Sequence, residues 1–140
     1  MKSFFILLIL SISSISLSQN EGEWQLFKSV SGVDFYQKET DCTPDNIPSQ
    51  KGVLIKIINT NEVSASISWE LDVWYNDVQH KANIRDGENE YHFTLDSNEK
   101  VEGSCNVPNG ALYIFKEFIV FKDDTKMTKF EFRNIKIQKD

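Results

Sequence analysis

GVLIKIINTNEVSASISWELDVWY, residues 52–75, is the stretch of the chain that decides its fold. Its second half alternates apolar and polar residues, which is the period of a strand with one face on a core and one in water. The apolar set of this half is Ile67, Trp69, Leu71, Val73 and Tyr75. The first half, VLIKII, is a dense β-branched run, and the polar NTNE segment between the runs tolerates turn geometry. We therefore predict two antiparallel strands joined by a connection at residues 59–64.

Short apolar runs recur about every ten residues on either side of this stretch. They predict a first strand at residues 24–30, an edge strand at 33–40, and further strands at 91–95, 101–105 and 127–137. The run ALYIFKEFIVF, residues 111–121, is apolar on both sides, so it predicts either a central strand or a strand that bends at Lys116 and Glu117.

The last strand changes phase along its length. Phe130 and Phe132 fall in one register, whereas Ile135 and Ile137 fall in the other. One extra residue near Arg133 and Asn134, a β-bulge, would place all four side chains on the core face.

These runs predict an all-β fold in a single domain at residues 19–140. No segment shows a sustained helical period, and about seven to nine short strands separated by turns are typical of an antiparallel β-sandwich. A small β-barrel is the alternative, although barrels of this size usually have longer and more uniform hairpins.

The first 18 residues have the order of a secretory signal peptide. Lys2 precedes the apolar run FFILLILSI, and small residues lead to a cleavage position after Ser18. The run is shorter than the roughly 20 residues that a membrane-spanning helix needs. We therefore expect an exported protein, in the periplasm, on the cell surface or in the medium, with no membrane span after cleavage.

The charge of the chain argues against nucleic acid as a partner. The whole sequence has 15 basic and 21 acidic side chains. Without Lys2 the remaining domain has 14 and 21, a net charge of −7. An acidic domain of this kind repels a phosphate backbone.

Cys42 and Cys105 are the two cysteines of the sequence. In an oxidising compartment we expect them to form a disulfide. Such a bond closes a loop of 64 residues, counting both ends, and would stabilise the fold by about 4 kcal/mol in the chain-entropy model. Two free thiols are the alternative, but the CxxC spacing of a redox pair is absent.

The series of short strands, with Trp69 on the most regular strand and two distant cysteines, resembles an immunoglobulin-like or fibronectin type III-like sandwich. The resemblance covers residues 24–137. Cys42 lies next to a proline-containing loop, and Gly103 stands where that family has a tyrosine before its second cysteine. We therefore expect the disulfide to link a loop or a strand at the edge of a sheet, and not to join the two sheets. The composition also resembles that of small exported proteins of low-GC bacteria.

Residues that could carry chemistry are few. Catalytic motifs with fixed spacing, such as GxSxG, HExxH or a P-loop, are absent from the sequence, and we expect no catalytic residue and no cofactor. His92 falls on the polar side of its strand, and His80 falls in a connection. Asp86, Glu88 and Glu90 are a weak calcium candidate, because they offer hard oxygen ligands without the spacing of an EF-hand loop.

Trp74 breaks the polar side of the strand at residues 65–75. An exposed tryptophan at a strand end is a suitable anchor for a protein or a sugar ring, so Trp74 is the candidate partner contact. The alternative is that Trp74 packs beneath the connection at residues 76–90 or against a second sheet.

Together these features predict a small exported module that binds a protein or glycan at the cell surface and is not an enzyme. The alternative is a small-ligand carrier, or an enzyme whose site is assembled from dispersed residues. A closed cavity lined by phenylalanines would favour the carrier, and convergent histidine and carboxylate groups in a cleft would favour the enzyme.

Overall fold

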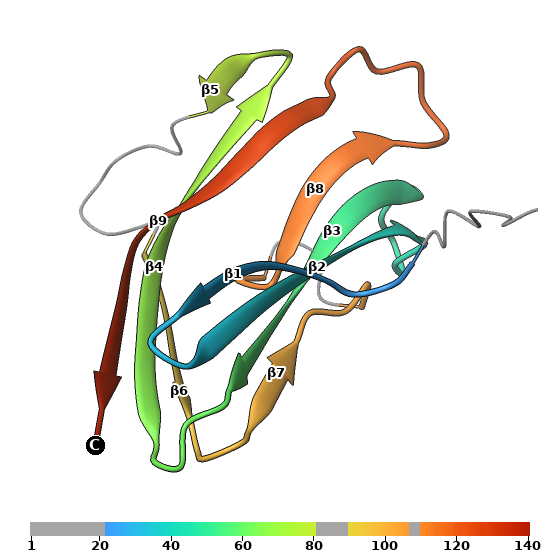
Figure 1. The fold of residues 1–140 in the computed structure, drawn as a ribbon. Helices are drawn as coiled ribbons and strands as arrows, with labels where there is room; N and C mark the ends of the chain where they lie inside the picture. Colours follow the sequence, from blue (N-terminus) through green and yellow to red (C-terminus); the bar gives the residue numbers. More distant parts are fainter. Residues whose placement is uncertain (1–21, 81–89, 107–109) are drawn as a thin grey trace, which may run out of the picture.

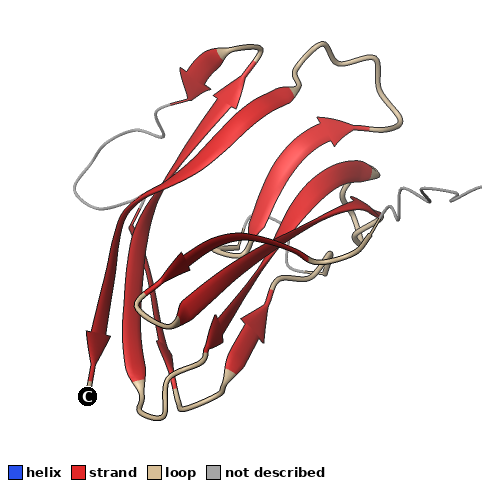
Figure 2. Ribbon diagram, in the orientation of Figure 1, coloured by secondary structure: helices blue, strands red, loops and turns tan. Residues whose placement is uncertain are grey.

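The computed structural model describes residues 22–80, 90–106 and 110–140, and it confirms an all-β sandwich (Figures 1 and 2). The proposed signal peptide, residues 1–18, lies outside the described residues. The first sheet contains β1 (Gln25–Val30), β2 (Val33–Cys42), β3 (Gln50–Asn59), β7 (Lys100–Glu102) and β8 (Tyr113–Phe118). The second contains β4 (Ala65–Tyr75), β5 (Val78–His80), β6 (Glu90–Leu95) and β9 (Met127–Lys139). The sheets stay separate, so the alternative of a closed barrel is wrong.

All strand pairs are antiparallel, and in each sheet two short strands share one edge. In the first sheet, β7 and β8 pair with successive parts of β3. In the second sheet, β6 and β5 pair with successive parts of β4, and β9 pairs with its other side. In the described part of the chain, no helix is long and apolar enough to cross a membrane.

Two predicted strands lie elsewhere in the sheets than expected, and Val78–His80, predicted to be part of a connection, forms the short strand β5. The strand at 33–40, predicted to be an edge, is β2, which lies between β1 and β3. The run at 111–121 is not central: β8 is an edge strand whose ladder with β3 is irregular at Lys116, so the predicted interruption is confirmed. The strand ends at Phe118, and the three apolar side chains that follow are exposed: Ile119, Val120 and Phe121.

The predicted pairing within residues 52–75 is wrong. β3 and β4 lie in opposite sheets, and the connection between them crosses from one sheet to the other (Figure 1). Both strands have a strongly apolar face, and the crossing lets the two faces meet across one core. Ile55 and Ile57 line this core from β3, and Ile67 and Trp69 line it from β4.

Trp69 is the centre of the core. Its side chain is fully buried, and its ring stacks between Phe93 on β6 and Phe132 on β9, with ring centres 5.8 and 5.3 Å away. Phe35 of the first sheet approaches the same ring edge-on at 6.1 Å. Aromatic pairs in these arrangements stabilise a core beyond their area burial.

The predicted bulge in the last strand is confirmed. Asn134 has φ 49°, and the register of β9 against β4 shifts between the partners of Ser68 and Glu70. The four side chains that the bulge was predicted to align all belong to the core or pack against it: Phe130, Phe132, Ile135 and Ile137.

One end of the sandwich, which we call the closed end, is held by Asn59. This side chain is fully buried at the start of the β3–β4 connection. Its amide nitrogen donates hydrogen bonds to the carbonyl oxygens of Val63, Leu95 and Asp96 at 2.9 to 3.1 Å, and its oxygen accepts from Asn61. These bonds join the β3–β4 connection to the β6–β7 connection beside it.

Candidate binding site

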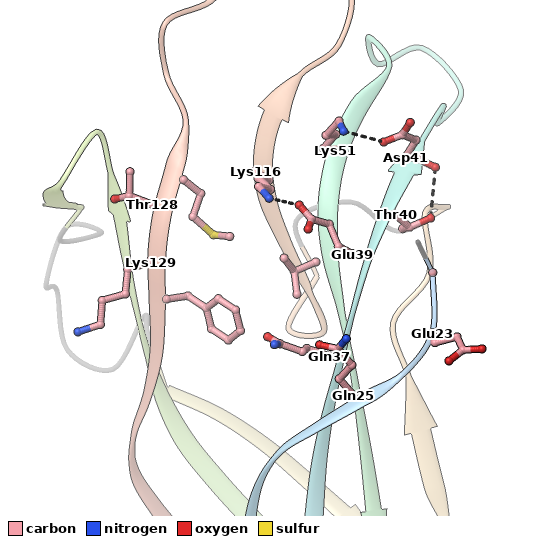
Figure 3. A pocket seen from close by; sticks show the side chains of 14 residues that line it. Glu23, Gln25, Gln37, Glu39, Thr40, Asp41, Lys51, Lys116, Thr128 and Lys129 are labelled. Atoms are coloured by element: carbon pink, nitrogen blue, oxygen red, sulfur yellow. Dashed lines mark hydrogen bonds and ion pairs between the residues drawn. The ribbon is translucent and has the colours of Figure 1, made fainter. Parts of the chain in front are cut away.

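At the other end, the open end, a cleft of about 870 Å³ lies between the two sheets (Figure 3). The inner face of β2, with parts of β3 and β8, forms one wall. The first residues of β9 form the other wall, and the chain at residues 22–25 lies at the rim. The structure therefore has one closed end and one end with a cleft between the sheets.

The pattern of β2 explains why the sheets part here. Val33 and Phe35 are fully buried in the core, and the same face continues with Gln37, Glu39 and Asp41. Burying charged groups without partners is costly, so these residues favour a gap that holds water over a dry interface. β1 pairs with β2 only as far as Gln37, so β1 does not extend the sheet beside this part of the cleft.

Two ion pairs run along this polar wall (Figure 3). Lys116 of β8 pairs with Glu39, and Lys51 Nζ of β3 lies 3.9 Å from Asp41 Oδ1. All four side chains are partly exposed, with 30 to 67% of their surface accessible. Exposed ion pairs contribute about 0–1 kcal/mol, so a ligand can replace these contacts at little cost.

Gln25 and Gln37 face each other across the β1–β2 ladder and complete the polar wall. In the described residues neither side-chain amide makes a hydrogen bond. Each amide therefore offers a donor and an acceptor to the cleft.

The wall formed by β9 is apolar. Met127 and Phe130 line the cleft and also pack against the core. The side chains of Thr128 and Lys129 point away from the cleft to the other side of the strand (Figure 3). The cleft is thus polar on one side and apolar on the other.

Trp74 is half-buried on the outer face of the second sheet, as its position on the polar side of the strand predicted. Its neighbours across the ladder are Gln79 on β5 and Lys129 on β9, and Lys129 Nζ lies 4.6 Å from the ring centre. Trp74 does not line the cleft. Its role as a partner contact stays a prediction.

The other candidates lie apart from the cleft. His80 is exposed on β5, and His92 is exposed on the outer face of β6, 3.6 Å from Glu90. Of the calcium candidate, Asp86 and Glu88 lie outside the described residues, whereas Glu90 begins β6. Within residues 22–80, 90–106 and 110–140, no cluster of histidine, cysteine and carboxylate side chains could hold a metal ion.

The predicted disulfide is present between Cys42 and Cys105. It ties the end of β2 to the segment after β7, and it belongs to a small cluster with Leu54 and Tyr113 that is separate from the main core. The disulfide therefore links two segments at the margin of the first sheet and does not join the two sheets, as expected. Burial raises the pKa of Tyr113.

The sequence reasoning missed the residues that form the cleft, although one signal was available. On β2 the positions that follow Phe35 on the core-facing side are polar: Gln37, Glu39 and Asp41. A strand whose core-facing side changes from apolar to charged marks the point where a core ends. The contributions of Lys51 and Lys116 required the arrangement of strands.

Comparison of the chain with protein-family models, with curated proteins and with solved structures finds no match. The cleft and its lining therefore carry the functional argument.

Proposed function

We propose that this chain is a small exported binding module that holds its partner in the cleft at the open end without making or breaking a bond in it. The observation that carries the proposal is the contrast between the two ends of the sandwich. Asn59 seals one end with buried hydrogen bonds, whereas the other end exposes Gln37 and two weak ion pairs to a cleft of about 870 Å³. Concave sites of this volume are where small ligands and chain segments bind.

Export is supported by the signal-like first 18 residues and by the Cys42–Cys105 disulfide, which is typical of oxidising compartments. Binding without catalysis is supported by the lining. Its carboxylates Glu39 and Asp41 are paired with lysines, and His80 and His92 lie elsewhere. A carrier is less well supported, because the cleft is open and Phe130 is the phenylalanine that lines it among the described residues.

The test is retention on the envelope fraction of the source organism. The chain is expressed with its first 18 residues and collected after export, together with Gln37→Trp, which fills the cleft, and Gln138→Trp on the exposed outer face of β9. We expect the wild type and Gln138→Trp to be retained and Gln37→Trp to be lost. Absence of retention, or equal retention of all three proteins, would contradict the proposal.

A second candidate is an accessory subunit that docks a protein at the segment after β8. Ile119, Val120 and Phe121 are 45, 60 and 56% exposed, and contiguous exposed apolar side chains are typical of protein contacts. If this candidate is right, the double variant Val120→Ser with Phe121→Ser should not be retained on the envelope fraction. The cleft variant Gln37→Trp should still be retained.

A further inference from the structure

We propose that the ligand of the cleft is a neutral glycan, an inference that rests on the proposed binding function. The charge of the lining is the first argument. Glu39 and Lys116 form one pair and Asp41 and Lys51 form the other, so the polar wall carries no net charge. A site for an anion or a cation would instead concentrate one sign of charge.

Two further charged residues lie at the rims of the cleft and do not change this balance. The side chains of Glu23 and Lys129 point away from the space between the walls, in opposite directions (Figure 3). Lys129 lies over the ring of Trp74 on the outer face. With Glu23 and Lys129 counted, the lining still has three acidic and three basic side chains, so its net charge is zero.

The two walls match the two sides of a sugar ring. Sugar hydroxyls both donate and accept hydrogen bonds, and the amides of Gln25 and Gln37 do the same with donors and acceptors that no described residue uses. The carboxylates and ammonium groups of the exposed pairs add further acceptors and donors. On the other wall, Met127 and Phe130 offer an apolar surface to the C–H face of the ring.

The spacing of the polar wall favours a chain of sugars over a single ring. Residues on one face of a strand repeat about every 7 Å, so Gln37, Glu39 and Asp41 form a row along β2. A peptide fits this wall less well. The backbone groups of β3 below the cleft pair with β2 and β8, so a peptide lying on this wall could not add a strand to β3.

Two measurements test the inference. In the first, the exported protein is titrated by calorimetry with neutral hexasaccharides of glucose, mannose, galactose and xylose, and with sulfated and amino-sugar hexasaccharides. We expect at least one neutral probe to bind, with a Kd that changes less than twofold between low and high salt, because no charge is neutralised. Gln37→Ala should weaken binding about tenfold, the loss expected when one hydrogen bond to the ligand is removed.

Gln138→Ala is the matched control, because it removes the same side chain from the outer face of β9, and it should bind as the wild type does. The near-ultraviolet circular dichroism spectrum, to which the buried aromatic core around Trp69 contributes, verifies that each variant is folded. The inference is overturned if none of the neutral probes binds, if only the charged probes bind, or if Gln37→Ala binds unchanged.

The second measurement separates this inference from the proposed function. Envelope material is treated with periodate, which cleaves vicinal diols of sugars, or with a protease. Retention that periodate abolishes and protease leaves intact supports a glycan. Retention that protease abolishes and periodate leaves intact overturns the glycan while the binding function stands. Absence of retention on untreated material overturns both.

Discussion

The hydroxyl of Tyr75 on β4 donates a 2.9 Å hydrogen bond to the carbonyl oxygen of Phe115 on β8, and so joins the two sheets at the open end. The rings of the two residues also lie 6.2 Å apart. This contact lies on the side of the sandwich where β4 approaches β8. It limits how far the sheets part, whereas the cleft forms on the side of β2 and β9.

Tyr75→Phe removes the hydrogen bond between the sheets and keeps the ring. We expect the free energy of unfolding to fall by about 1 kcal/mol in urea denaturation, the usual net value of one such bond. Tyr91→Phe is the control, because the Tyr91 hydroxyl makes no hydrogen bond with a described residue. An equal loss in both variants would show that Tyr75 does not join the sheets.

The same residue predicts how stability depends on alkaline pH. Burial raises the pKa of Tyr75, and Tyr113 raises it further. The unfolded chain loses this proton near pH 10, but the folded protein loses it at higher pH. The free energy of unfolding should therefore fall as pH rises from about 10 to the folded pKa. Tyr75→Phe should reduce this slope, and an unchanged slope would contradict the prediction.

The buried side chain of Asn59 stabilises the closed end, so its substitution should destabilise the fold. Asn59→Ala leaves the carbonyl oxygens of Leu95 and Asp96 without their buried donor, and we expect a loss of about 3 kcal/mol in thermal or chemical denaturation. Asn59→Asp should lose more at neutral pH, because a carboxylate would face these oxygens. Asn106→Ala, at an exposed position, should change stability by less than about 0.5 kcal/mol.

The backbone conformation at Asn134 limits which residues can occupy the bulge of β9 without loss of stability. Its φ of 49° lies in the left-handed region, which is costly for β-branched residues. We expect Asn134→Gly to keep the stability within about 0.5 kcal/mol and Asn134→Val to lose about 1–2 kcal/mol. If both variants unfold at the same denaturant concentration, the bulge does not depend on this conformation.

Gly103 and the Cys42–Cys105 disulfide hold the residues that directly follow β7, and both can be tested by substitution. A Cβ atom at Gly103 would overlap the carbonyl oxygen of Leu112, which itself accepts a hydrogen bond from Ile55. Gly103→Ala should therefore cost about 2 kcal/mol through strain. Replacing Cys42 and Cys105 by serine should cost about 4 kcal/mol, measured against the wild type under non-reducing conditions. A loss below 1 kcal/mol would show that the unfolded chain is already compact.

The sequence predicted the positions of most strands well, but it predicted poorly which strands pair with each other. Alternation located β4, β6 and β9, and the change of phase in β9 placed the bulge near Arg133 and Asn134, because each is a local property of one strand. The pairing of β3 with β4 was wrong because a polar connection of several residues permits either a hairpin or a crossing between sheets. The buried amide of Asn59 favours the crossing, and its partners at Leu95 and Asp96 are distant in sequence.

By itself, the sequence determined the all-β class, the two-faced strands and the cysteine pair, since these depend on periodicity and on residue type alone. The tertiary structure decided which sheet each strand joins and where the core stops. The candidate site depends on that second step. Glu39 and Lys116 lie 77 positions apart in the chain, and they meet because β2 and β8 pair with opposite sides of β3 and turn the same face toward the cleft.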